Sequence, residues 1–119
     1  PDTLDLEGTP TIIANASGVD VKLAISGVTP AKVLTADSTD GVITLGGADA
    51  ADIDTLAEWV DVAKLMTTAD GETSAFAFGG DTYVFQENTG GDLLIKLTGV
   101  AAADALATSG TGANDIRIG

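Results

Sequence analysis

A β-hairpin predicted within residues 78–100 is the feature that most constrains this fold. Two runs of β-branched, aromatic and long apolar residues, 82–85 (TYVF) and 93–97 (LLIKL), each follow a Gly-Gly-Asp turn. In the second run Leu93, Ile95 and Leu97 alternate with other side chains, the period of two that a half-buried strand requires. Residues 74–78 (SAFAF) form a further strand just before the hairpin, so we expect a three-stranded antiparallel meander.

The remaining pattern predicts short strands and one main helix. Further strands are expected at residues 2–7, 11–14, 19–25 and 42–45, with a helical turn at residues 31–34 after Thr29 and Pro30.

The main helix is expected at about residues 50–67, capped by Asp49 or Asp52. Its apolar stripe contains Ile53, Leu56 and Val60, and we expect it to pack on the face that carries Leu93, Ile95 and Leu97. The predicted fold is a β-rich α+β domain spanning residues 1–119, with an antiparallel sheet or sandwich of short strands.

Charge and composition narrow the function classes. The net charge of −13, from 18 acidic and 5 basic residues, repels nucleic acid and anionic membrane surfaces, and no apolar run is long enough to span a bilayer. Cysteine and histidine are absent, which removes thiol nucleophiles, structural zinc sites and the usual general base. No phosphate-binding glycine motif occurs, and acidic pairs are too frequent to mark a site. We therefore predict that the chain is not an enzyme.

Calcium is the one cofactor that the composition suits, because loop carboxylates among Gly, Thr and Asn are hard oxygen ligands. The acidic loops in question are residues 37–40, 49–54 and 87–92, and the candidate ligands are Asp49, Asp52, Asp54 and Asp92. A solvated acidic surface without bound ions explains the same residues equally well.

The terminal strands suggest self-association. The first predicted strand carries Leu4 and Leu6, and the last carries Ile116 and Ile118. Exposed strand edges present unpaired N–H and C=O groups that another copy can satisfy, so these four residues are the predicted assembly edge. The alternative is that both termini pair within one chain.

The segment GGDTYVFQENTGGDLLIKLTGV resembles the C-terminal region of bacterial proteins exported by type I secretion, namely RTX-type toxins, proteases and S-layer proteins. The opening DTLDLEG is similar to the DTLDLSG with which the calcium-binding β-rolls of that group end. The resemblance covers residues 76–119 and 2–8, and it implies an uncleaved C-terminal export signal and an extracellular location. The chain departs from the β-roll nonapeptide at residues 46–52, where Asp49 replaces a glycine and Ala51 replaces the aspartate, so no calcium ladder is expected.

Two functions are consistent with these observations. The first is a non-enzymatic, self-assembling extracellular module, a subunit of an S-layer, matrix or filament whose partners are copies of itself. The second is a calcium-stabilised export or binding appendage of a larger secreted protein.

Overall fold

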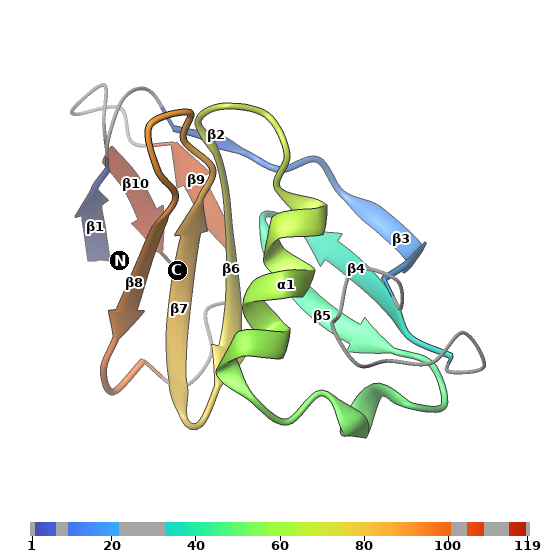
Figure 1. The fold of residues 1–119 in the computed structure, drawn as a ribbon. Helices are drawn as coiled ribbons and strands as arrows, with labels where there is room; N and C mark the ends of the chain where they lie inside the picture. Colours follow the sequence, from blue (N-terminus) through green and yellow to red (C-terminus); the bar gives the residue numbers. More distant parts are fainter. Residues whose placement is uncertain (1, 7–9, 22–32, 101–104, 109–114, 119) are drawn as a thin grey trace.

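A computed structural model describes residues 2–6, 10–21, 33–100, 105–108 and 115–118. Two sheets and one α-helix make up this part of the chain (Figure 1). The larger sheet runs in the order β3-β4-β5-β6-β7-β8, with the short β2 paired to β6. The smaller sheet has the order β1-β10-β9. The predicted β-rich α+β class is therefore confirmed, although the larger sheet is mixed rather than purely antiparallel.

The bounds of the elements are as follows: β1 Asp2–Asp5, β2 Thr11–Ile12, β3 Ala16–Asp20, β4 Thr35–Thr39, β5 Val42–Gly46, α1 Leu56–Met66, β6 Glu72–Phe78, β7 Asp81–Gln86, β8 Leu93–Leu97, β9 Leu106–Thr108 and β10 Asp115–Ile118.

The meander β6-β7-β8 has the predicted antiparallel register. Phe78 pairs with Asp81 across the Gly79-Gly80 turn, and Gln86 pairs with Leu93 at the far end. The expected strand at residues 42–45 is also present as β5. Strands β4 and β9 were not predicted, because TADST is largely polar and LAT is too short to show the alternation that identifies a strand. The described start of the strand predicted at 19–25 lies in β3, and residues 22–25 fall outside the described residues. Of the helical turn predicted at 31–34, residues 31–32 fall outside them and residues 33–34 are not helical.

Helix α1 begins later than predicted, at Leu56, and the chain before it forms only a 3-10 turn at Ala50–Asp52. Thr55 is the N-cap, not Asp49 or Asp52, and it forms a capping box with Glu58. The Glu58 N–H donates to Thr55 Oγ1 at 3.3 Å, and the Thr55 N–H donates to Glu58 Oε1 at 3.1 Å. Two N–H groups at the helix start thereby gain partners, which fixes the helix start at this threonine.

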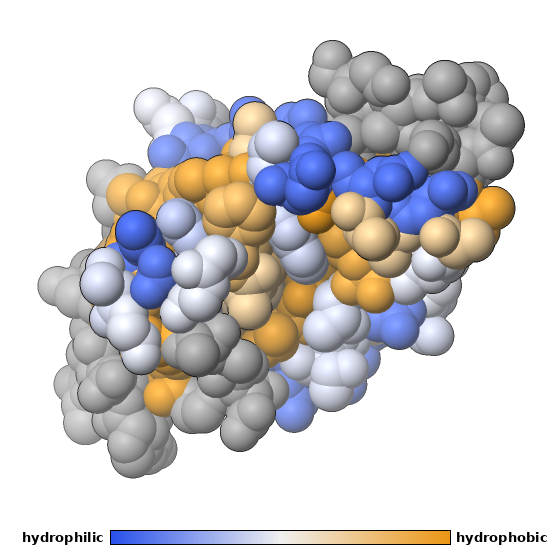
Figure 2. Space-filling model, turned by 90° about the horizontal axis from the view of Figure 1, so that it is seen from below, coloured by the Kyte–Doolittle hydropathy of each residue, from blue (hydrophilic) through white to orange (hydrophobic). Residues whose placement is uncertain are grey.

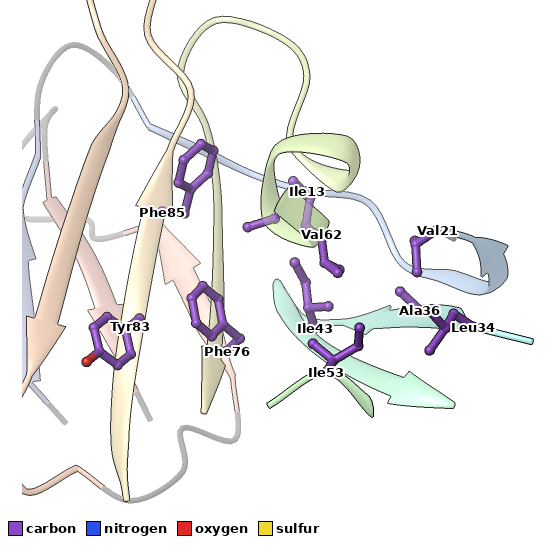
Figure 3. Packing of buried hydrophobic residues seen from close by; sticks show 11 residues of the cluster. Ile13, Val21, Leu34, Ala36, Ile43, Ile53, Val62, Phe76, Tyr83 and Phe85 are labelled. Carbon is purple, nitrogen blue, oxygen red and sulfur yellow. The ribbon is translucent and has the colours of Figure 1, made fainter. Parts of the chain in front are cut away.

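The helix packs on the face of the meander opposite to the predicted one. Val62 and Ala63, its buried residues, belong to a core cluster with Phe76, Tyr83 and Phe85 (Figure 3). Large aromatic side chains bury more apolar area than the Leu93/Ile95/Leu97 stripe, so the aromatic face holds the helix. The buried face of the helix is also rotated about the helix axis relative to the predicted stripe, since Val60 is only partly buried while Val62 is fully buried.

Three aromatic rings join α1 to this sheet. Trp59 stacks on Phe76 with ring centroids 5.1 Å apart, and Phe76 stacks on Tyr83 at 5.5 Å. The rings connect the helix, β6 and β7 in one continuous stack.

The stripe of Leu93, Ile95 and Leu97 packs on the smaller sheet instead. These side chains surround a second core cluster whose buried members are Leu6, Ala75, Val84, Leu106, Ile116 and Ile118. The meander is therefore the middle of three layers, between α1 and the sheet β1-β10-β9 (Figure 1).

The turn between β4 and β5 ties the parts of the molecule together. The Gly41 carbonyl accepts from the Ala75 N–H of β6 at 2.9 Å, and the Asp40 carbonyl accepts from the Leu106 N–H of β9 at 2.7 Å. Asn15 Oδ1 accepts from the Asp40 N–H at 2.8 Å. Both turn residues have positive φ, 49° for Asp40 and 83° for Gly41. One tight turn thus holds strands of both sheets.

Candidate functional site

Two acidic loops meet at one end of the molecule, where α1 leads into β6 and where β7 leads into β8 (Figure 1). Asp70 of the first loop joins them, because its Oδ1 accepts from the N–H and the hydroxyl of Thr89 at 2.7 and 3.1 Å. Within the second loop, Asp92 Oδ1 accepts from the Asn88 N–H at 3.2 Å. These hydrogen bonds hold carboxylates from both loops near each other.

An open depression of about 350 Å³ lies between these loops, lined by Asp70, Asn88, Thr89, Gly90 and Gly91. The lining of this depression is polar. Figure 2 shows the opposite end of the molecule, where apolar surface forms a band between hydrophilic regions. The size suits a hydrated ion or a small polar molecule.

Repulsion among carboxylates marks the same place. Desolvation raises the pKa of Glu87, and the neighbouring Asp92 and Asp70 raise it further, while Lys64 acts in the opposite direction. A raised carboxyl pKa means that the folded chain resists charging this group. A positive charge placed near Glu87 would lower its pKa and stabilise its charged form.

The four predicted calcium ligands do not come together. Asp49, Asp52 and Asp54 lie between β5 and α1, whereas Asp92 lies before β8 at the other end of the helix (Figure 1). Asp49 Oδ2 accepts from the Val33 N–H at 2.6 Å, so this carboxylate holds a loop. Among the described residues, no group of three or more acidic side chains is placed to hold a metal ion.

Sequence reasoning included residues 87–92 among the candidate acidic loops but missed Asp70. Asp70 is followed by Gly71, a pair typical of a turn, and the approach of Asp70 to Thr89 depends on the pairing of β6 with β7. No pattern in the sequence alone therefore predicted the contact between Asp70 and Thr89.

The predicted assembly residues lie inside the chain's own fold. Leu4 pairs with Ile116 between β1 and β10, and Leu6, Ile116 and Ile118 are buried in the second core cluster. The intramolecular alternative is thus the arrangement observed, because pairing within one chain buries these apolar side chains without the cost of association. The four residues are corrected from an assembly edge to core positions.

Other strand edges remain open. Strand β8 ends the larger sheet and β1 ends the smaller one, each with a single neighbouring strand in the part of the chain that the structure describes. On β8, Leu94 is 40% exposed, and the Lys96 side chain, 51% exposed, lies 3.5 Å from Asp81. Helices in the described ranges are too short and polar to cross a membrane.

No family model matches the chain, and neither a curated protein nor a solved structure shows significant similarity to it.

Proposed function

We propose that this chain is a non-enzymatic, self-associating module of an extracellular surface structure, such as an S-layer, matrix or filament, exported by a type I-like route. The observation that carries the proposal is that β8, at the end of the larger sheet, has a strand neighbour on one side only among the described residues and bears an exposed leucine. Unpaired strand edges of this kind favour pairing with another chain.

The resemblance to type I-secreted proteins supports the extracellular location. The two segments that carry the resemblance are far apart in the sequence, but their strands β1 and β10 pair, and both contribute to the core shared with β7 and β8. Both segments therefore belong to one packed unit. The net charge of −13 also suits a highly solvated surface protein.

The proposal is tested by measuring particle mass over a range of protein concentrations by sedimentation. Oligomers or ordered polymers that grow with concentration support it. A monodisperse monomer at every concentration, with and without calcium, contradicts it.

The acidic loops favour a second candidate, a calcium-stabilised export or binding appendage. Desolvation and the neighbouring Asp92 and Asp70 disfavour the charged form of Glu87, and a divalent cation would favour that form. Under this candidate, millimolar calcium raises the melting temperature while the mass stays that of a monomer. An unchanged melting temperature between calcium and chelator, at matched ionic strength, argues against it.

A further inference from the structure

The larger sheet has its shortest strand pairing between β5 and β6. These strands share a single residue pair, Val42 with Ala75, whereas β6 pairs with β7 from Thr73 to Phe78. Past Val42, β5 runs away from β6 (Figure 1). The junction is also parallel, and parallel pairing is slightly less stable per residue than antiparallel pairing. Strands β3, β4 and β5, which we call the subsheet, are therefore joined to β6 at one point.

The hydrogen bonds from the β4-β5 hairpin to β6 and β9 lie at the same point. The Gly41 carbonyl accepts from the Ala75 N–H at 2.9 Å, and the Asp40 carbonyl accepts from the Leu106 N–H at 2.7 Å. Both acceptors are in the two-residue turn at the tip of the hairpin. Residues 43–46 of β5 pair only with β4 in the described part of the chain. The tip is thus placed as a hinge for the rest of the subsheet.

Helix α1 is held more specifically to β6 than to the subsheet. Trp59 stacks on Phe76 at 5.1 Å, and the buried hydroxyls of Thr67, the C-cap, and Ser74 lie 2.8 Å apart. On the other side, Val62 packs in the first core cluster with apolar side chains of the subsheet such as Ile43 (Figure 3). This apolar interface can open without breaking a strand ladder, although opening it exposes buried surface.

The subsheet also has its own internal pairing. Strand β4 pairs with β5 along its whole length and with β3 on its other side. Asp37 Oδ1 of β4 accepts from the Gly18 N–H of β3 at 2.7 Å. The chain just before β3 belongs to the other part, because the Ile13 N–H donates to the Thr73 carbonyl at 3.2 Å. Cooperative units of partial unfolding often coincide with such a self-paired motif.

We propose that the subsheet opens as one cooperative unit about the turn at Asp40 and Gly41, while α1, the meander and the sheet β1-β10-β9 stay folded. The open state exposes the apolar face of the subsheet and the side of α1 that carries Val62. It leaves the second core cluster intact, because none of the buried members of that cluster comes from β3, β4 or β5.

Native-state hydrogen exchange followed by NMR tests the proposal. By alternation from the two-residue turns, the amides of Asp37 and Thr44 bond between β4 and β5, and those of Phe76 and Tyr83 bond between β6 and β7. Where exchange reports the opening equilibrium, Asp37 and Thr44 should be about tenfold or more less protected than Phe76 and Tyr83. The two amides of the subsheet should share one opening equilibrium.

Two matched core variants identify which parts open together. Ile116→Ala weakens only the second core cluster, so it should lower the protection of Phe76 and Tyr83 about tenfold or more and leave that of Asp37 and Thr44 unchanged. Ile43→Ala weakens the packing of the subsheet, which is lost in partial and in complete unfolding alike, so it should lower the protection of all four amides.

The milder Ile116→Val serves if Ile116→Ala does not fold, with an expected loss of about twofold or more at the meander amides alone. The proposal is overturned if Asp37 and Thr44 are protected as strongly as Phe76 and Tyr83. It is also overturned if the Ile116 variants lower the protection of both sets equally, since the chain would then open only as a whole.

Discussion

At the scale of single residues, backbone conformation and local charge determine what each position tolerates. Gly41 and Gly80 illustrate this, because they have nearly the same φ, 83° and 86°, in different surroundings. A Cβ at Gly41 would lie 2.6 Å from Ile12 Cγ2, whereas a Cβ at Gly80 would meet nothing within 4 Å. Alanine at Gly80 would therefore report only the destabilisation due to the positive φ, whereas alanine at Gly41 would add the destabilisation due to steric collision.

Gly41→Ala should lower the free energy of unfolding by about 2–4 kcal/mol, since it combines a left-handed backbone with a collision in the core. Gly80→Ala, the matched control, should cost only about 1–2 kcal/mol for the backbone. Urea unfolding of both variants measures the difference. Equal losses would show that the turn at Gly41 can shift to admit a methyl group.

Glu87 should give a pH-dependent signature. Its pKa is raised in the folded chain, so this group favours folding while it is protonated, and that contribution is lost as the pH rises from the ordinary glutamate pKa through the raised value. Glu87→Gln should therefore stabilise the protein at pH 7 relative to wild type, with the gain vanishing at acidic pH.

The control for Glu87→Gln is Asp61→Asn on α1, which removes one negative charge away from the two loops. Thermal unfolding of both variants at neutral and acidic pH provides the comparison. If the two substitutions stabilised the protein equally at pH 7, the surroundings of Glu87 in the two loops would not disfavour its charge.

At the scale of elements, the helix is held by its packing on the aromatic face of the meander rather than by its own length. An isolated helix of 11 residues is marginal in water. The stack of Trp59, Phe76 and Tyr83, together with the buried Val62 and Ala63, supplies the missing stability.

Val62→Asp should cost on the order of 3 kcal/mol or more, because it places an unpaired charge in the first core cluster. Ala57→Asp, on the exposed side of the same helix, should change stability by less than about 0.5 kcal/mol. Chemical denaturation followed by Trp59 fluorescence reports both values. A small loss for Val62→Asp would mean that α1 separates from the sheet in solution.

At the scale of the whole molecule, the terminal strands complete the core behind the meander. Ile116 is fully buried and lies opposite Leu4, so the two ends of the chain depend on each other for their burial. The terminal strands thus belong to the folded unit itself.

Ile116→Ala should lower the free energy of unfolding by about 2–5 kcal/mol through lost burial and the cavity left behind. Because the contact lies within one chain, the loss should not depend on protein concentration. Leu94→Ala offers the contrast, with little change in stability under monomeric conditions. A concentration-dependent loss for Ile116→Ala would return the terminal strands to an assembly role.

The sequence by itself determined the meander, the presence of one helix and the strand at residues 42–45, because these depend on local periodicity and turn residues. It also indicated that residues 87–92 form an acidic loop. Only the tertiary structure decided which face of the meander meets α1, since both faces are apolar and the choice depends on the volume of Phe76, Tyr83 and Phe85. The meeting of Asp70 with Thr89 and the burial of Leu4 against Ile116 were likewise decided by strand pairing between residues distant in sequence. Several strands could pair with the same neighbour or pack on the same face, and only the fold of the whole chain selects among these arrangements.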